Sequence, residues 1–570
     1  MNLKNAFLAF LAAMSSWAVA PAGPIPDRAG VYELVNAEQW SDVVPLLTRS
    51  VEINPYYGED WYLLGLAHAR LGNCEAAEEP FARSIELGAN GRSWGMRNAH
   101  VEAAACAAQL GDIDAAVDHL AVAQARYKFN GFERFDADPT FERLTADPAY
   151  RRLTGKRDGS AAGRVDGWSS DLDYYVDLME RRHPNPFHTV DKADWYAAVS
   201  TLRQQIPELT DLDVIVGFMR LASMIGDGHT TIYPPFDGPL AFHMTPVWPY
   251  AFGDDWRIIA AAPEFADLVG ARIVAVEGVP MAEAAERIAA HLPSDNTMTH
   301  KWIVNVGLQF AEVAQGIFGS SDVCCLSLEL LLETGERRTV RLPGGDIDRN
   351  PMAAWTPAHW PSAQAELSPS WLKNVDAKHW YETFDDVGLV YAQINQVRDD
   401  ESRSLEAFGR ELRQVLSEGD HRHLVIDLRH NNGGNGYLNW PFVRELVRTE
   451  ALDRPDGLFV ITGRRTFSAA MLLSSMIEFH TDALFVGEPT GSSPQFYGED
   501  TEFQLPYSKL AGSISSFWFQ NRFTSDDERP WIAPDIVAEL TFDDLRTGRD
   551  PAMQAIREYL ESRDKVGDPN

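Results

Sequence analysis

Residues 423–434 read HLVIDLRHNNGG, and residues 458–470 read LFVITGRRTFSAA. Each stretch begins with apolar, largely β-branched residues and ends in glycine or other small residues, which predicts a buried strand followed by a turn. The surrounding pattern predicts further strands at 388–394 and 483–486 and helices at 401–416, 438–449 and 468–480. Strands that alternate with helices indicate a parallel sheet with right-handed crossovers. The expected fold class of this part, 380–560, is therefore α/β.

The ends of these two strands carry residue types that suit catalysis. In parallel sheets the chemistry gathers at the carboxyl ends of the strands. Gly433 and Gly434 allow positive φ angles and expose backbone N–H groups, as the binding of an oxyanion requires. Ser468 lies between a strand and a helix, where helix N–H groups favour a developing negative charge. We predict that Ser468 is a nucleophile; the alternative is that it only caps the helix, a common role of serine.

A candidate base lies on a tight loop upstream. The apolar helix predicted at 214–225 ends at the sequence GDGHT, residues 226–230, and a glycine after the last turn is a helix stop signal. His229 is thereby placed where backbone can approach a cleft, although most histidines have structural roles. Helical spacing predicts a helical lead-in over 167–238, and a change to short strands predicts a β-rich region over 239–345.

Three motifs taken together resemble the tail-specific (C-terminal processing) serine protease family: D-L-R-x-N-x-G-G from Asp427, T-F-S-A-A from Thr466 and G-E-P-T-G from Gly487. The HPNP sequence at 183–186 and the GDGHT loop are similar to the branch related to tricorn protease and interphotoreceptor retinoid-binding protein. The resemblance covers about residues 165–560. It implies a crotonase-like α/β core, a Ser468 nucleophile and oxyanion donors from the N–H groups of Gly433 and Ala469. Residues 268–280 resemble part of a PDZ module, so a PDZ-like insert is expected within 239–345.

The chain departs from the family in its general base. Many members use a lysine some 25 residues after the serine, but Ser493 stands there, and no lysine lies between Ser468 and Lys509. The tricorn-like branch uses histidine, which His229 matches. That branch has a serine directly before the histidine, whereas this chain has Gly228. The tricorn-like branch also uses a glutamate that lies shortly before a P-D-I sequence.

Glu528, which precedes Pro534-Asp535-Ile536, is the candidate for this glutamate, with Asp526 and Asp527 as rivals. The alternative is that these acids form a solvated charge run. No cofactor is implied by any of these motifs.

The N-terminal part follows a different pattern. Trp61, Leu64, Gly65, Ala77 and Phe81 fit the tetratricopeptide pattern W-x2-L-G-x2-Y…A-x3-F. We predict tetratricopeptide-like helical repeats over 29–127 and a linker over 128–166. The repeats could form a groove that binds a protein partner or serve as a packed helical spacer.

The four cysteines include one pair that the repeats would bring together. Cys74 begins the second helix of one repeat and Cys106 ends the first helix of the next, so stacking predicts a disulfide between them. Two buried thiols are the alternative. No bond is expected between the neighbours Cys324 and Cys325. Because no C-x-x-C pair occurs, neither a zinc site nor any other metal site is expected.

The first 22 residues resemble a signal peptide. Lys4 precedes an apolar run at 6–14, and small residues allow cleavage after Ala20 or Ala22. The alternative is a buried N-terminal helix. Cleavage would make the protein periplasmic or secreted. No other run of 18 or more apolar residues is present, so no membrane span is expected.

Composition narrows the choice of partners. Lys and Arg number 50 against 83 Asp and Glu, giving a net charge of −33 that repels nucleic acid. The predicted function is that of an exported serine peptidase that cleaves a peptide or protein substrate by a Ser-His mechanism through an acyl-enzyme. The alternatives are a non-catalytic periplasmic binding protein for apolar ligands and a repeat-based envelope scaffold.

Overall fold

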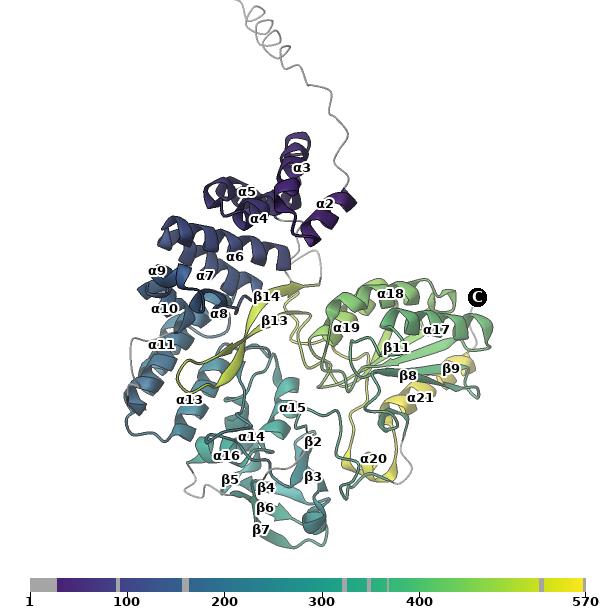
Figure 1. The fold of residues 1–570 in the computed structure, drawn as a ribbon. Helices are drawn as coiled ribbons and strands as arrows, with labels where there is room; N and C mark the ends of the chain where they lie inside the picture. The colour runs from purple at the N-terminus through teal and green to yellow at the C-terminus, as the bar shows by residue number, and fades with distance from the viewer. Residues whose placement is uncertain are drawn as a thin grey trace, which may run out of the picture. The chain divides into compact units, whose positions relative to one another are not determined.

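A computed structural model describes residues 28–88, 93–155, 163–319, 325–345, 350–365, 369–521 and 527–566. The chain divides into two compact units, residues 1–160 and residues 161–570 (Figure 1). The predicted signal peptide, residues 1–22, lies outside the described residues. In the described ranges, no helix is both long and apolar enough to cross a membrane.

The first unit is entirely helical. Its longer helices are α2 (Arg28–Asn36), α3 (Trp40–Ile53), α4 (Gly58–Arg70), α5 (Cys74–Leu87), α6 (Ser93–Leu110) and α7 (Ile113–Tyr127). Successive helices pack against one another. Gly65 lies under the ring of Phe81, where an added Cβ would come within 2.7 Å of a ring carbon. A small residue is thus needed for α4 and α5 to approach, as the repeat pattern requires. The assignment to tetratricopeptide repeats stays a prediction.

The expected cysteine pairing is present in this unit. Cys74 and Cys106 form a disulfide, with their Cα atoms 5.0 Å apart, inside the usual range of about 4.4–6.8 Å. Both residues are buried between α5 and α6. Cys325 is also disulfide-bonded, which leaves the expectation of no bond between Cys324 and Cys325 without support; Cys324 itself lies outside the described residues.

The predicted linker at 128–166 is wrong over most of its length. Four short helices occupy it: α8 (Glu133–Asp136), η3 (Pro139–Phe141), α9 (Glu142–Thr145) and α10 (Pro148–Thr154). Phe135, Phe141 and Tyr150 are buried in one core with α6 and α7. The Asp-Pro pairs that suggested a loop begin helices instead, because Asp138 and Asp147 cap them with side-chain hydrogen bonds.

The second unit begins with the predicted helical lead-in, α11 (Arg164–Arg182), α12 (Lys192–Gln205) and α13 (Asp211–Ser223). The loop after α13 leads into the short strand β1 (Thr231–Ile232), which pairs with a long hairpin, β13 (Gln495–Gln504) and β14 (Ala511–Gln520). This hairpin was not predicted. It brings a distant part of the chain beside the His229 loop.

The region 239–345 contains the predicted strands but also three helices. Its sheet has the order β2-β3-β4-β6-β7, with β5 paired to β4. The strands are β2 (Val247–Phe252), β3 (Asp255–Ala261), β4 (Arg272–Val276), β5 (Val279–Pro280), β6 (Cys325–Leu331) and β7 (Arg337–Pro343). The helices are α14 (Met281–Ala289), α15 (Thr297–Gly307) and α16 (Ala311–Phe318), and they share one core with the lead-in helices. The expectation of a mainly β region is thus only partly met, and a PDZ-like identity stays a prediction.

The third sheet is the predicted one, in the order β15-β12-β11-β10-β9-β8. Its strands are β8 (His379–Phe384), β9 (Leu389–Ile394), β10 (His423–Asp427), β11 (Leu458–Thr462), β12 (Leu484–Gly487) and β15 (Ile536–Val537). All neighbours from β9 to β15 are parallel, and only β8 is antiparallel.

Helices cover both faces of this sheet. Since alternate residues of a strand point to opposite faces, each strand packs against helices on both sides. These helices are α17 (Leu405–Glu418), α18 (Asn439–Val447), α19 (Ala469–His480) and α21 (Pro551–Val566). Helix α20 (Phe542–Thr547) packs elsewhere, because Phe542 and Leu545 share a core with Trp248 and Phe252 of β2. Leu424 and Ile426 of β10 pack with α17, α18 and α19, whereas Val425 packs with α21 on the other face (Figure 1). The multidomain α/β architecture expected from the sequence is confirmed, and the carboxyl ends of β10 and β11 lie side by side.

Candidate active site

Ser468 occupies the turn between strand β11 and helix α19. Its backbone angles are φ +53° and ψ −123°, a conformation that costs a non-glycine residue about 1–3 kcal/mol and is concentrated at functional sites. Although Ser468 stands at the N-cap position, its side chain makes no capping hydrogen bond. The alternative that this serine only caps the helix is therefore not supported.

The hydroxyl of Ser468 faces His229, which is 239 positions away in the sequence; Nε2 of the histidine lies 3.0 Å from Oγ. If Nε2 accepts the serine proton, the neutral ring carries its own hydrogen on Nδ1. That Nδ1 is buried and has no hydrogen-bond partner in the described part of the chain. The ring is held instead by stacking on Phe467 and Phe496, with centroids 4.7 and 5.7 Å away.

The loop that carries His229 is fixed by a buried carboxylate, Asp227. Its Oδ1 accepts the backbone N–H groups of His229 at 2.9 Å and Thr230 at 2.7 Å, and the hydroxyl of Ser515 from β14 at 2.7 Å. Its Oδ2 lies 3.0 Å from His183 Nε2. Burial by itself would raise the pKa of Asp227, but the hydrogen bond and charge of His183 lower it to about 2. Asp227 therefore stays ionised and serves as a structural anchor.

His183, from the HPNP motif, helps to hold the Asp227 carboxylate in place. Its Nδ1 accepts the backbone N–H of Asn185 at 3.1 Å, so the hydrogen on Nε2 must be the one donated to Asp227. The sequence suggested only that His183 shapes a turn. Its link to the catalytic loop was missed, since nothing in the sequence brings residues 183 and 227 together.

A second carboxylate, Asp295, holds the same loop from another side. Its Oδ1 accepts the backbone N–H of Gly228 at 2.6 Å, and its Oδ2 accepts the hydroxyl of Ser492. Burial raises the pKa of Asp295 to about 6. A Cβ on Gly228 would lie 2.5 Å from the Phe467 ring. A side chain at this position would therefore displace the ring that stacks on His229.

The predicted oxyanion donors lie beside the serine but differ in availability. Gly433 has φ +123°, and an added Cβ would lie 2.7 Å from Ser468 Cβ, so only glycine fits. Its N–H, however, donates to Asn431 Oδ1 at 3.0 Å, which makes it a weaker candidate than expected. The N–H groups of Gly434 and Ala469 donate to no described residue. These two remain as the available donors.

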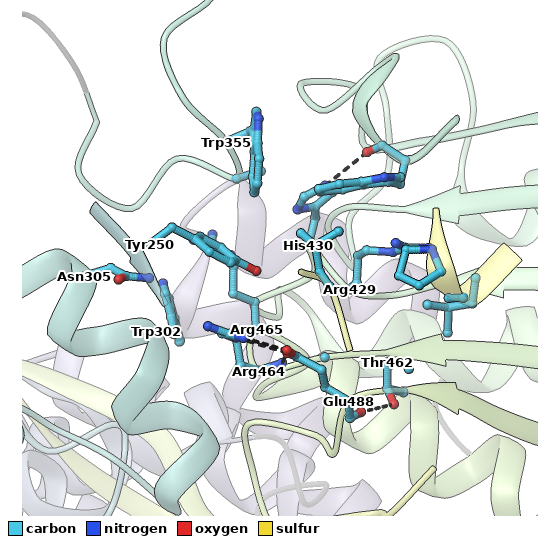
Figure 2. A pocket seen from close by; sticks show the side chains of 18 of the residues that line it. Tyr250, Trp302, Asn305, Trp355, Arg429, His430, Thr462, Arg464, Arg465 and Glu488 are labelled. Atoms are coloured by element: carbon cyan, nitrogen blue, oxygen red, sulfur yellow. Dashed lines mark hydrogen bonds and ion pairs between the residues drawn. The ribbon is translucent and has the colours of Figure 1, made fainter. Parts of the chain in front are cut away.

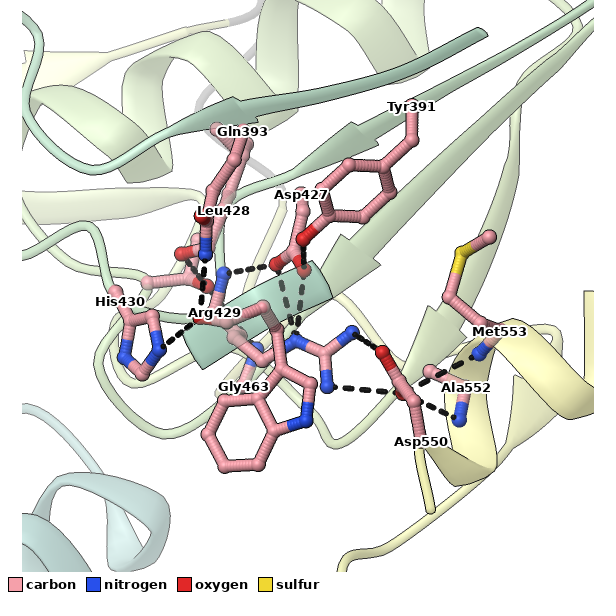
Figure 3. A network of polar contacts seen from close by, with 12 residues as sticks. Tyr391, Gln393, Asp427, Leu428, Arg429, His430, Gly463, Asp550, Ala552 and Met553 are labelled. Atoms are coloured by element: carbon pink, nitrogen blue, oxygen red, sulfur yellow. Dashed lines mark hydrogen bonds and ion pairs between the residues drawn. The ribbon is translucent and has the colours of Figure 1, made fainter. Parts of the chain in front are cut away.

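The strand end that carries the glycines is braced by a buried ionic network (Figure 3). Arg429 Nε donates to Asp427 at 2.9 Å, and its two terminal nitrogens donate to Asp550 at 3.1 and 3.0 Å. The hydroxyl of Tyr391 donates to Asp427 at 2.7 Å. Burial by itself would lower the pKa of Arg429, but the two carboxylates raise it. As predicted, Asp427 and Arg429 support the strand end.

An apolar cavity of about 310 Å³ opens beside His229. Gly228, His229, Asn432 and Phe467 form part of its wall next to the Ser468 hydroxyl. The side chains further from the serine are almost all apolar and include Ile232, Phe236, Leu292, Ile303, Phe310 and Val313. Such a cavity can accept a large apolar side chain close to the nucleophile.

A smaller cavity of about 70 Å³, drawn in Figure 2, is lined by aromatic and charged side chains. It shares Trp302, Val306 and Pro351 with the apolar cavity. Arg464 pairs there with Glu488. Arg465 donates to the carbonyls of Met352 and Ala353, each at 3.0 Å, and burial lowers its pKa to about 10. Arg465 thus fixes the segment that borders both cavities.

The predicted role of Glu528 stays a prediction. Glu528 is exposed and forms no hydrogen bond or ion pair with a described residue, while Asp527 pairs with Arg529; Asp526 lies outside the described residues. Ser493 donates to the Pro530 carbonyl. Lys509 donates to the carbonyl of Pro506. Among the described side chains, no three His, Cys, Asp or Glu gather as metal ligands would.

No protein-family model and no curated protein sequence matches the chain. The solved structure of mature CPAF complexed with lactacystin matches it with a TM-score of 0.50 and 14% identity, over 71% of this chain and 98% of that chain. The chain shares the fold of mature CPAF. The photosystem II D1 C-terminal processing protease matches with 15% identity and a TM-score of 0.31, over 69% of this chain and 99% of that one. Tricorn protease matches with 14% identity and a TM-score of 0.32, over 70% of this chain and 37% of its own. The likeness to mature CPAF concerns the fold alone.

Proposed function

We propose that this protein is an exported serine peptidase with Ser468 as nucleophile and His229 as general base. The observation that carries the proposal is the 3.0 Å contact between Ser468 Oγ and His229 Nε2. A strained serine that faces a histidine instead of capping its own helix is the arrangement expected of an activated nucleophile. The likeness in fold to known proteases supports a peptidase over a binding protein or a scaffold.

In the proposed reaction, Ser468 Oγ attacks the carbonyl carbon of a peptide bond while His229 Nε2 takes the hydroxyl proton. The N–H groups of Gly434 and Ala469 stabilise the oxyanion of the tetrahedral intermediate. His229 then gives its proton to the leaving amine as the C–N bond breaks, which leaves an acyl-enzyme. Water, deprotonated by His229, hydrolyses the ester and restores the serine.

The apolar cavity supports a preference for a large apolar residue next to the scissile bond. It lies against His229 and Phe467, so a side chain bound there would hold the adjoining carbonyl near Ser468. Apart from His229, Asp500 is the only charged side chain among the described residues that line the cavity. Acidic side chains would therefore bind poorly at this position.

Labelling with a fluorophosphonate tests the proposal directly, because such probes react with activated serines. We expect stoichiometric labelling of the wild-type protein at Ser468, identified by peptide mapping, and no labelling of Ser468→Ala. A library of peptides that differ in one residue should then show faster cleavage after large apolar residues. A wild-type protein that is folded but takes up no label would refute the proposed function.

A further inference from the structure

The proposed base lacks the orienting acid that the sequence led us to expect. Glu528 is exposed and without a described partner, and His229 Nδ1 is buried without an acceptor. When Ser468 loses its proton, His229 becomes an imidazolium in a water-poor site, and such a charge is costly unless another charge offsets it. The imidazolium therefore needs a nearby acid to offset its charge.

Asp295 is held in place on one side by its neighbours in the chain. Asn296 caps helix α15 and also donates to the carbonyls of Thr490 and Pro530, at 3.1 and 2.7 Å. The hydroxyl of Thr299 donates to the Gly491 carbonyl. These bonds join the start of α15 to the loop after β12, so the carboxylate beside them has little freedom to move.

On its other side, Asp295 touches the catalytic loop itself. Its Oδ1 accepts the N–H of Gly228, the residue directly before His229, at 2.6 Å. The absence of a side chain at Gly228 leaves this approach open, since an added Cβ would lie 3.1 Å from Asp295 Oδ1. The charges that act on this carboxylate are those of His229 and Asp227.

We propose that Asp295 is a positioning residue for His229, which fixes the catalytic loop through Gly228 and supplies the negative charge that stabilises the imidazolium. This inference rests on the proposed function. Asp227 fits the role less well, because its charge is shared among two backbone N–H groups, a hydroxyl and the ring of His183.

Ionised Asp295 makes the folded protein less stable than protonated Asp295 does. Such strongly shifted groups are concentrated at functional sites. Burial raises its pKa to about 6 from an ordinary 3.8, so the folded protein binds the proton more tightly than the unfolded chain does. Stability is therefore lost as the pH rises from about 4 through 6, and the loss is complete above that range. A neutral residue of the same shape should remove this loss.

Asp295→Asn separates a positioning role from a structural one. Asparagine can still accept from Gly228 through Oδ1, while the negative charge is gone. We expect the rate constant for fluorophosphonate labelling of Ser468 to fall at least about tenfold at pH 8, because the negative charge that stabilises the imidazolium is removed. The acidic limb of its pH profile should move to lower pH. The melting temperature at pH 8 should rise above that of the wild type, and the two should converge near pH 4.

Asp482→Asn is the matched control, because Asp482 is exposed and makes no described polar contact, and it should leave labelling unchanged. An unchanged labelling rate in Asp295→Asn would overturn the inference. So would a slower rate accompanied by a lower melting temperature at pH 8, since that result means a structural role. If the wild type itself takes up no label, the proposed function fails, and the melting curves alone still report whether Asp295 carries the expected charge.

Discussion

Ser468 Oγ and His229 Nε2 lie 3.0 Å apart, and in the proposed mechanism one proton passes between them, so neither residue would act without the other. We predict that Ser468→Ala and His229→Ala each lower kcat/KM for a peptide substrate by at least about 1,000-fold, and that the double variant is little worse than either. Steady-state kinetics on the three variants measures this. Multiplicative effects would show that the two residues act independently, against the mechanism proposed here.

Gly228 offers a second test at the scale of one residue. The motif resembles that of the tricorn-like branch, in which serine stands at this position, and a simple reading of the resemblance would make Gly228→Ser a gain. A Cβ at this position would lie 2.5 Å from the Phe467 ring, and that ring stacks on His229. We predict that Gly228→Ser lowers kcat by about tenfold or more, because a small shift of a catalytic group is costly. Activity at or above the wild-type level would contradict this account.

The site shows which residues a sequence can and cannot reveal. Ser468, His229 and the paired glycines carry local signals: a turn after a strand, a glycine-flanked loop, positive φ angles. Asp295 carries none, because its role comes from a contact with Gly228 that only the folded chain creates. Glu528 was selected for its place in a motif, and the structure leaves it exposed.

At the scale of secondary-structure elements, Asp550 joins helix α21 to the end of strand β10 through Arg429. The side chains of Arg429 and Asp550 are only 14% and 8% exposed. Removing Asp550 leaves the two terminal nitrogens of the buried Arg429 without their acceptor, so we predict that Asp550→Ala lowers the free energy of unfolding by about 3 kcal/mol. Denaturant titration measures this.

The matched control for that experiment is an exposed ion pair made by the same helix. Arg557 of α21 pairs with Asp386 in solvent, where Asp386 is 66% exposed. Exposed pairs contribute little because water and salt screen them. Asp386→Ala should therefore leave stability nearly unchanged; a loss as large as that of Asp550→Ala would mean that α21 is held by something other than the buried network.

The success of prediction also differed between elements. The central strands were found almost to the residue, because a strand buried on both faces is a continuous apolar run, as in LFVIT at 458–462. The hairpin of β13 and β14 was missed since its sequence mixes charged and aromatic residues and its pairing joins distant segments. The linker prediction failed because Asp-Pro pairs serve equally as loop formers and as helix starts.

At the scale of the whole molecule, two features bear on the compartment in which the protein works. They are the cysteine pairing and the N-terminal sequence. A disulfide such as Cys74–Cys106 persists in oxidising compartments and is rare in the cytosol. An apolar run ending in small residues is the pattern of a cleaved signal. Both observations favour export, and neither depends on the proposed chemistry.

We predict that the full chain, expressed in a bacterium with a secretion pathway, is recovered from the periplasm or medium without its first 20 or 22 residues. Intact-mass analysis under non-reducing conditions should give the mass of a chain beginning at Pro21 or Gly23, and thiol alkylation before reduction should leave Cys74 and Cys106 unmodified. The same chain made without residues 1–22 should stay in the reducing cytosol with both thiols free to react, because the disulfide depends on the compartment. Recovery of a cytosolic protein that still begins at Met1 would make the export prediction wrong while leaving the Ser468–His229 site to be judged by labelling alone.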